Sequence, residues 1–338
     1  MTFILFILIL GIIVFIHEFG HFIFAKKAGI YVYEFSLGMG PRLFKFNRKN
    51  DETEYSIRLF PIGGYVQMAG EEIEQDKKIP DDKKMQSKTW LQRFLTVIAG
   101  VVMNFILGLI LLFIYALLNG ATTNNTYIAT STNDKLQVGD LITKLNGESA
   151  TNQDVFLIKY ASNLERGKDI TIEVKHKDNT YEEVTLRLNE DKNYGISFAG
   201  EIEEGFIASI KYAFTKFGNL ILQMWYTISY LITGKLSLNN LSGPIGIYQV
   251  VDETAKIGFV NIVYLMALLS INVGFINLLP IPSFDGGRVL FMAIEKVKGS
   301  PVSPKIENTI HTIFFILLMA LMIAITYNDI VKVIFKGW

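Results

Sequence analysis

Four long apolar stretches constrain this chain more than any other feature of its sequence. They cover residues 2–25, 94–119, 260–282 and 309–327. Each approaches or exceeds the roughly 20 residues that an α-helix needs to cross a bilayer. Half of the 338 residues are apolar and the formal net charge is zero, so nothing points to nucleic acid as a partner. We therefore predict a polytopic α-helical membrane protein with four transmembrane helices in a lipid bilayer.

Basic residues indicate how these stretches are oriented. Lys26 and Lys27 follow the first stretch directly, and more Lys and Arg crowd the segments 26–93 and 283–308. Because short cytoplasmic loops carry an excess of Lys and Arg, we expect both segments on the cytoplasmic side. The N-terminus and the segment 121–204 then lie outside. The chain has no cysteine, which excludes a thiol nucleophile and a cysteine metal site.

A segment between the first two stretches reads TEYSIRLFPIGGYVQMAGE. Apolar and polar residues alternate in its first half, which is typical of a strand. Pro61 and the pair Gly63–Gly64 favour a turn, and a return strand begins at Tyr65. We predict a membrane-associated β-hairpin over residues 53–68. An ordinary loop hairpin is the alternative.

The composition turns polar over residues 121–204. In LQVGDLITKLNGESA, a Gly-Asp turn, an alternating strand and an Asn-Gly turn follow one another, which is the pattern of a hairpin. A helical pattern over 154–165 and alternating strands at 169–175 and 181–188 complete a small α+β domain. We interpret His176 as a surface residue of this domain.

The segment 205–234 has apolar residues at helical spacing, interrupted by Lys211 and Lys216. We predict an amphipathic helix on the outer membrane surface rather than a fifth span. The chain would thus comprise four parts in order: 1–120 as the first half of a membrane core, 121–204, 205–234, and 235–338 as the second half of the core.

The first apolar stretch contains VFIHEFGHFIFAKKAG, where His17, Glu18 and His21 interrupt a run of hydrocarbon. Ionisable residues at membrane depth are costly and are functional candidates by default. On a helix, His17 and His21 lie on one face one turn apart, so both imidazoles can bind one metal ion while Glu18 takes a proton from a water. The pattern predicts a zinc site that hydrolyses amide bonds. A chance match at the interfacial end of a span is the alternative.

Two histidines do not complete a zinc site, so a third ligand is required. Asp285 is the natural candidate, because it stands in NLLPIPSFDGGRVL just past the third apolar stretch and reaches the same leaflet as His17. Pro and Gly around it predict a broken helix, which at membrane depth is tolerated only where it lines a cavity or is buried in protein. Two alternatives stay open: Asp285 could cap a helix, and His311 could be the ligand instead.

Together these motifs resemble the site-2 protease family of intramembrane zinc metalloproteases, and within it the bacterial regulator-of-sigma-E proteases. The resemblance rests on HEFGH, EYSIRLFPIGGYVQMAGE, GVVMN, LSGPIGI and NLLPIPSFDGG, in that order along nearly the whole chain. It implies one Zn²⁺ per chain, held by His17, His21 and Asp285, with Glu18 as general base. It also implies a bacterial inner-membrane enzyme whose site faces the cytoplasmic leaflet.

The resemblance extends to substrate binding. It implies that Asn277 helps to hold the substrate backbone and, less directly, that Asn104 does, for which an interhelical hydrogen bond is the alternative. A substrate helix must unwind before its amides can react, and the predicted hairpin could offer it an edge strand. We therefore expect Gly63, Gly64 and Tyr65 to engage substrate, with turn formation as the alternative. VGDLITKLNGE in the polar insert resembles a PDZ module, which implies a size filter for substrates trimmed by another protease.

Two hypotheses for the function follow. The first is a zinc endopeptidase that cleaves within the transmembrane segments of single-span proteins, such as anti-sigma factors or remnant signal peptides. The second is a non-catalytic membrane scaffold, or an ion- or proton-coupled transporter, whose PDZ-like insert docks partners. Only the first accounts for a Glu directly after the first His together with a carboxylate at the same depth.

Overall fold

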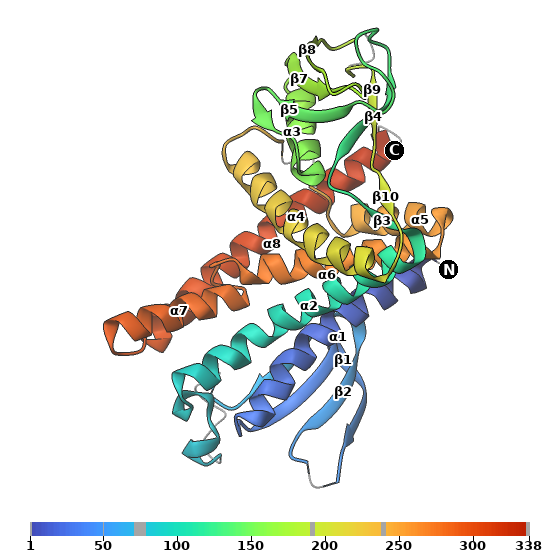
Figure 1. Ribbon diagram of the computed structural model, residues 1–338. Coiled ribbons are helices and arrows are strands. Elements are labelled where there is room, and N and C mark those ends of the chain that lie inside the picture. The colour runs from blue at the N-terminus through green and yellow to red at the C-terminus, as the bar shows by residue number, and fades with distance from the viewer. Residues whose placement is uncertain (1, 50, 71–78, 190–192, 238–240, 336–338) are drawn as a thin grey trace. The chain divides into compact units, whose positions relative to one another are not determined.

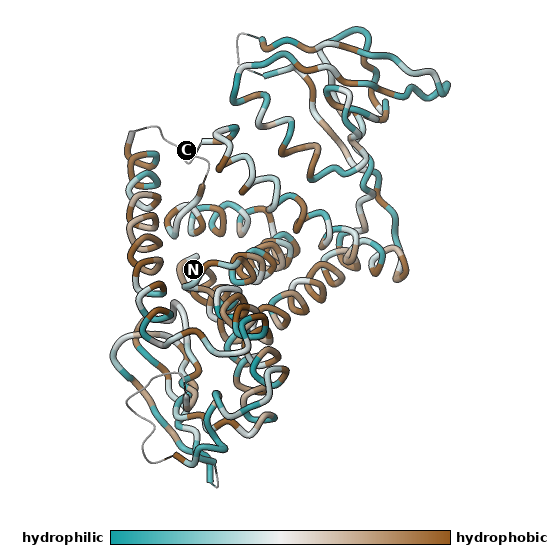
Figure 2. Tube along the Cα trace, turned by 90° about the vertical axis from the view of Figure 1, so that its left-hand side faces the viewer, coloured by the Kyte–Doolittle hydropathy of each residue, from teal (hydrophilic) through white to brown (hydrophobic). Residues whose placement is uncertain are grey.

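The computed structural model describes residues 2–49, 51–70, 79–189, 193–237 and 241–335. Four helices within these ranges are long and apolar enough to cross a membrane. They are α1 (Thr2–Lys27), α2 (Trp90–Asn119), α6 (Phe259–Leu278) and α8 (Pro304–Phe335). Long brown tubes mark such helices in Figure 2. The prediction of four helices of membrane-spanning length is confirmed, although α6 ends before Pro280 and α8 extends beyond the predicted stretch at both ends.

The chain forms two compact units. One consists of the residues up to Gly108 together with those from Ser242 onward, and the other of Leu109–Leu241. The first unit also contains α5 (Pro244–Ile257) and α7 (Asp285–Lys298), which lie outside the predicted elements (Figure 1). Each has only 14 residues, which is fewer than the roughly 20 that a helix needs to cross a bilayer.

Helix α1 is the centre of the first unit. Its N-terminal half packs against α5 and α6, where the buried side chains are Phe6, Ile9, Ile13, Val251 and Leu265. Its neighbour α2 crosses it closely at Gly20, where a Cβ would lie 2.6 Å from the backbone oxygen of Ala99. Small residues at such crossings let two membrane helices approach closely. The close crossing brings α2 against the histidine-bearing half of α1.

The C-terminal half of α1 packs against a strongly bent pair of strands, β1 (Val32–Asn47) and β2 (Glu54–Met68). A shared core of buried apolar side chains joins helix and strands: Ala25, Ile30, Val32, Phe35, Val66 and Met68. Strand β1 carries Gly and Pro within its sequence, which hides its strand pattern. For this reason the sequence gives no prediction of β1.

The predicted hairpin over 53–68 is wrong in its pairing. Residues 54–68 form one continuous strand, and its partner is β1. Within the bend, residues 34–37 pair both with 64–67 and with 54–57. Gly63, where a turn was expected, lies inside β2 with a φ of 89°. The alternating pattern therefore identifies the strand correctly, but it does not reveal which segment pairs with it.

The second unit contains a small antiparallel sheet whose strands run in the order β8-β7-β5-β4-β9, with β6 paired to β5. The strands of this unit are β3 (Ala121–Thr122), β4 (Thr126–Ser131), β5 (Leu141–Leu145), β6 (Glu148–Ser149), β7 (Ile170–Lys175), β8 (Tyr181–Leu186), β9 (Ile196–Ala199) and β10 (Ile202–Glu203). Asn146 and Gly147 form the predicted turn with φ values of 50° and 80°, as a type I′ hairpin turn requires.

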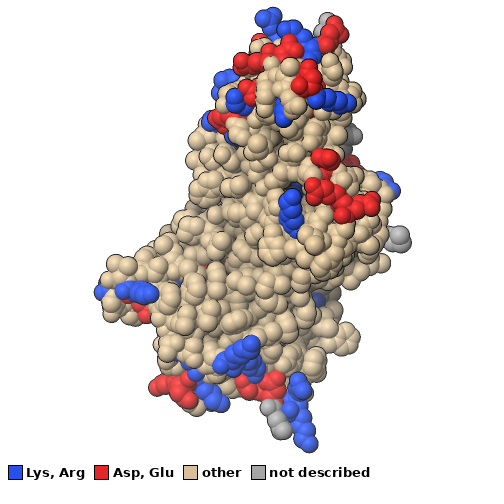
Figure 3. Space-filling view, viewed as in Figure 1, with Lys and Arg blue, Asp and Glu red and all other residues tan. Residues whose placement is uncertain are grey.

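The predicted helices of the second unit are confirmed. They are α3 (Gln153–Glu165) and α4 (Phe206–Ile232), and α3 begins at Asn152, whose side chain accepts from the backbone N–H of Val155. Helix α4 exposes large apolar side chains, among them Phe206, Ile207 and Trp225. On the face shown in Figure 3, charged side chains gather over the sheet of this unit, and in the first unit over the strands β1 and β2, while most helix surface is uncharged.

Candidate active site

Two buried histidines define the candidate site. His17 and His21 lie one turn apart on α1, so the predicted helical placement is confirmed. Their Nε2 atoms are 3.2 Å apart. Both imidazoles therefore present the same ring nitrogen to one point in space.

Asp285 meets this pair from another part of the chain. Its Oδ2 lies 3.1 Å from His17 Nε2 and 3.4 Å from His21 Nε2. Among the described residues, these three form the one group of potential metal ligands whose donor atoms all lie within 4.8 Å of one another. His311 is outside this group, and its Nε2 lies 3.9 Å from Glu307 Oε1. The structure thus brings Asp285, rather than His311, to the two histidines.

A tight fold of the chain after α6 places Asp285. Helix α6 ends at Leu278, and Asp285 is the first residue of α7, whose N-cap position is Phe284. A Cβ on Gly286 would lie 2.2 Å from the backbone oxygen of Leu278, and one on Gly287 would lie 2.4 Å from that of Ile281. Only glycine permits backbones to approach this closely. The Pro and Gly residues around Asp285 therefore form the predicted broken helix.

The three donor atoms suit a zinc ion. Two imidazole nitrogens and one carboxylate oxygen are typical protein ligands of a catalytic zinc. Asp285 Oδ2 is buried and makes no hydrogen bond of acceptable geometry, although it lies close to both imidazoles. Helix α2 leaves room beside the imidazoles at Gly100, where a Cβ would lie 2.4 Å from His21 Nε2 and 2.8 Å from His17 Nε2. The residues present fit the metal that the sequence motif predicts.

Helix α2 also supplies the partners that orient the two imidazoles. His21 Nδ1 lies 2.8 Å from the backbone oxygen of Thr96, and the Asn104 side chain contacts His17 Nδ1 at 3.3 Å. Such outer partners fix the orientation and tautomer of a ligating histidine. The Thr96 contact uses a backbone atom, so no sequence signal could have found it. Asn104 was expected to contact substrate or to form an interhelical hydrogen bond, and the structure shows a contact of the second kind, to His17 of α1.

A cavity of about 540 Å³ opens beside the histidines. Its lining includes the three potential ligands, Glu18, residues 65–68 of β2, Arg288 and His311. Strand β2 passes close to Glu18, because a Cβ on Gly64 would lie 3.1 Å from the Glu18 Cγ. The site therefore combines a potential metal centre, a carboxylate and a strand around one space.

The predicted substrate residues differ in where they lie. Tyr65 lines the cavity and Gly64 borders Glu18, whereas Gly63 contacts the side chain of Met39 at the bend. Asn277 lies half-buried in the last turn of α6. It is not among the described residues that line the cavity. The structure thus brings Gly64 and Tyr65 to the site more directly than Gly63 or Asn277.

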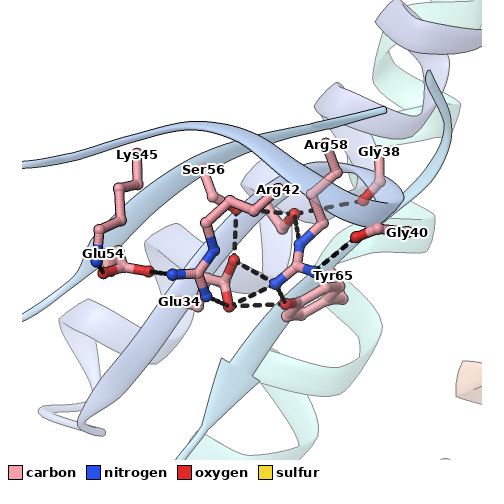
Figure 4. A network of polar contacts seen from close by, with 10 residues as sticks. Glu34, Gly38, Gly40, Arg42, Lys45, Glu54, Ser56, Arg58 and Tyr65 are labelled. Atoms are coloured by element: carbon pink, nitrogen blue, oxygen red, sulfur yellow. Dashed lines mark hydrogen bonds and ion pairs between the residues drawn. The ribbon is translucent and has the colours of Figure 1, made fainter. Parts of the chain in front are cut away.

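A polar network holds Tyr65 in place (Figure 4). The Tyr65 hydroxyl donates to Glu34 Oε2 at 2.7 Å, and Arg58 donates to Glu34 Oε1 at 2.9 Å. Ser56 and Arg42 also donate to Glu34. Burial and the hydrogen bond to Glu34 raise the pKa of Tyr65 to about 12. The hydroxyl therefore stays protonated and hydrogen-bonded to the sheet beside the cavity that Tyr65 lines.

Glu34 is the residue of this network that the sequence does not single out. Burial alone disfavours its charge, but hydrogen bonds from Ser56, Tyr65 and Arg58 hold the pKa of the carboxyl below its ordinary value. Three of its partners, Ser56, Arg58 and Tyr65, come from β2, more than 20 positions away along the chain. Sequence spacing carries no signal for such a contact.

Comparison with known proteins decides the family. The model of peptidase family M50 matches residues 5–321. This chain belongs to peptidase family M50. It is 34% identical to zinc metalloprotease RasP of Shouchella clausii, over 98% of this chain and 99% of the relative. It is 31% identical to the regulator of sigma-W protease RasP of Bacillus subtilis, over 97% and 98%. A putative zinc metalloprotease of Fusobacterium nucleatum is 36% identical, over 98% and 99%.

Membership in family M50 confirms the predicted site-2 protease family and makes this chain a zinc metalloprotease. It therefore favours the protease hypothesis over a non-catalytic scaffold or a transporter. The cluster of His17, His21 and Asp285 is consistent with the zinc site of such an enzyme. Its two histidines lie on a helix of membrane-spanning length, which fits a protease that works within a membrane.

Proposed function

We propose that this M50 protease is an endopeptidase that hydrolyses peptide bonds within the transmembrane segments of single-span membrane proteins. One observation carries the proposal: the histidine pair of α1 meets Asp285 beside a cavity that also contains Glu18. Because α1 is long and apolar enough to span a bilayer, a substrate segment could reach this cavity from the membrane.

Each chain would hold one zinc ion through His17, His21 and Asp285. A zinc ion there supplies a Lewis acid that makes water a nucleophile at neutral pH and polarises the scissile carbonyl. Glu18 lines the same cavity and serves as general base, taking a proton from the attacking water and passing it to the leaving amine. Asp285 and the outer contacts of the imidazoles keep the three donor atoms converged.

Strand β2 would bind the unwound substrate. Residues 64–67 pair with 34–37 along one edge, and Tyr65 to Met68 line the cavity. Adding an extended segment to a strand edge replaces the backbone hydrogen bonds that the substrate helix loses. Gly64 and Tyr65 would contact the bound substrate segment, and Gly63 would allow the bend of β2. Asn277 would hold the substrate backbone from the end of α6.

The expected orientation follows from the basic residues at the end of α1. Lys26 and Lys27 place that end in the cytoplasm, so the site faces the cytoplasmic leaflet of the bacterial inner membrane and the sheet of the second unit lies outside. We assign this sheet to a PDZ-like domain that acts as a size filter, and α4 to the outer membrane surface. One relative is named regulator of sigma-W protease, which supports anti-sigma factors as substrates, with remnant signal peptides as a further class.

The decisive experiment replaces Glu18 by Gln in the full chain. We expect zinc to be retained, because Glu18 is not a ligand, and cleavage of a single-span model substrate in vesicles to fall by about 10²–10⁴-fold, the usual contribution of a general base. Glu52→Gln, which changes a carboxylate paired with Lys26, is the matched control and should cleave normally. A Glu18→Gln variant that cleaves at the wild-type rate, or a wild-type protein that binds no zinc, would overturn the proposal.

A further inference from the structure

Asn104 is fully buried in the membrane helix α2 and its amide contacts a candidate zinc ligand. Its Nδ2 lies 3.3 Å from His17 Nδ1, and its backbone oxygen accepts a hydrogen bond from the Ser270 hydroxyl at 2.9 Å. Its Oδ1 is buried without a hydrogen-bond partner. A buried amide with one end unpaired calls for an explanation.

The position of the zinc site fixes which nitrogen of each histidine must be free. The two Nε2 atoms face each other and Asp285 Oδ2, so Nε2 is the ligating atom of both rings. A neutral imidazole carries one hydrogen, which must then sit on Nδ1 and needs an acceptor. His21 has one, because the backbone oxygen of Thr96 lies 2.8 Å from its Nδ1.

Within the described part of the chain, Asn104 is the residue that contacts His17 Nδ1, so the acceptor for His17 has to be its side-chain oxygen. With the amide nitrogen toward the ring, Asn104 would donate to Nδ1, and the hydrogen of His17 would be forced onto Nε2, where it blocks metal binding. The two ends of a side-chain amide have nearly the same shape and are told apart by their hydrogen-bond partners. Rotating the Asn104 amide by about 180° presents its Oδ1 to His17 Nδ1. The Nδ2 end of the amide then lacks a partner, where the Oδ1 end lacked one before.

We infer that Asn104 is a positioning residue of the zinc site, whose side-chain oxygen accepts the Nδ1 hydrogen of His17 and so leaves Nε2 free for the metal. This inference rests on the proposed zinc site. It assigns Asn104 to the histidine rather than to substrate. Each ligating ring then has a hydrogen-bond acceptor from α2. This acceptor is the Thr96 backbone oxygen for His21 and the Asn104 side-chain oxygen for His17.

Two substitutions separate an acceptor from a donor at this position. Asn104→Leu keeps the branched shape and has no hydrogen-bonding side-chain atom, whereas Asn104→Asp keeps an acceptor and removes the donor. Zinc affinity of the full-length protein in detergent is measured by competition with a chelator. We expect Asn104→Leu to weaken zinc binding by about 10–100-fold, the usual effect of losing an outer partner, and Asn104→Asp to stay within about threefold of the wild type.

Ser270→Ala is the matched control, because it removes the other interhelical hydrogen bond of Asn104 and should leave zinc affinity within about threefold. Melting of the zinc-free variants shows whether any loss reflects misfolding. Wild-type zinc affinity in Asn104→Leu would overturn the inference. So would a loss in Asn104→Asp equal to that in Asn104→Leu at unchanged zinc-free melting temperature.

A second measurement works even if Asn104→Asp does not fold. ¹⁵N spectra of histidine-labelled, zinc-loaded wild type report which ring nitrogen of His17 carries the hydrogen. We expect it on Nδ1, with a hydrogen-bonded signal that shifts in Asn104→Leu, and an Nδ1 signal that is the same in both proteins would overturn the inference. If the wild type binds no zinc at all, the proposed function itself fails, which is a separate outcome from a failure of Asn104 alone.

Discussion

Two carboxylates of the first unit, the buried Glu34 and the partly buried Asp285, have different partners. Glu34 faces the guanidinium of Arg58 at 2.9 Å and that of Arg42 at 3.4 Å, both of which are permanently charged. The contacts of Asp285 are imidazole nitrogens, at 3.1 and 3.4 Å, and imidazole is the commonest metal ligand in proteins.

The difference separates a structural carboxylate from a ligating one. A buried charge is tolerated when it is paired or when it coordinates a metal. The chain supplies the cations for Glu34, which therefore fastens the β1–β2 sheet. The cluster around Asp285 instead converges three electron-pair donors on one point, which is the arrangement that a divalent cation completes.

The largest effect short of removing a ligand is expected from Gly100→Ala. The new Cβ would lie 2.4 Å from His21 Nε2 and 2.8 Å from His17 Nε2, so the rings must move away from the metal position. We expect zinc affinity to fall at least as far as the roughly 10–100-fold that follows loss of an outer partner. Gly11→Ala on α1, where nothing lies within 4 Å of the added Cβ, is the control. Equal zinc retention by both variants in a chelator challenge would refute this account of the site.

The Glu34 network should affect stability instead of metal binding. Glu34→Gln removes the charge that Arg58 and Arg42 face, and hydrogen bonds to charged groups contribute roughly 1.5–3 kcal/mol each. We expect a free energy of unfolding lower by about that amount, with zinc retained. Lys45→Ala, which breaks an exposed pair with Glu54, should cost less than about 1 kcal/mol. If Glu34→Gln lost zinc without a change in melting temperature, Glu34 would act on the metal site, and its assignment as a purely structural carboxylate would be wrong.

The structural role of Glu34 also predicts how the stability of the protein depends on pH. Because the pKa of Glu34 is lowered on folding from its ordinary value of 4.5, its contribution to stability is present above pH 4.5 and is lost as the pH falls through the lower folded value. Comparing the acid melting curves of wild type and Glu34→Gln isolates this contribution. The two curves should converge at low pH, and parallel curves would count against it.

The smallest effect concerns His176, in the sheet of the second unit. The carboxylate of Asp140, 2.9 Å from the ring, and the nearby Glu182 raise the pKa of His176. The stability it contributes is therefore full below its ordinary value of 6.5 and is lost as the pH rises through the folded value. Hydrogen exchange of the β5 and β7 amides, corrected for intrinsic rates, should show this loss in wild type and not in His176→Gln. The same pH dependence of exchange in wild type and His176→Gln would rule out this contribution of His176 to stability.

Local patterns predicted much of the fold and the centre of the site. The four spans follow from apolar length alone, and His17 and His21 follow from spacing on one helix. Asp285 came from chemistry and topology, because glycine and proline mark the break that presents it. The Asn-Gly turn at residues 146–147 was equally local.

Contacts between distant segments could not be predicted. Strand β1 pairs with β2 through a bend that alternation does not reveal, so the hairpin was assigned the wrong partner. The Thr96 backbone acceptor has no side-chain signal. Asn104 meets His17 across 87 positions of sequence, and this contact depends on the close crossing of α1 and α2 at Gly20.

The most direct test of the central claim is zinc content combined with X-ray absorption at the zinc edge. Wild type should hold one zinc ion with two imidazole ligands and a carboxylate. Asp285→Asn should lose affinity by more than the about 100-fold upper range for an outer partner, whereas His311→Asn, which changes a residue lining the same cavity, should keep its zinc. Full retention in Asp285→Asn with loss in His311→Asn would contradict the account.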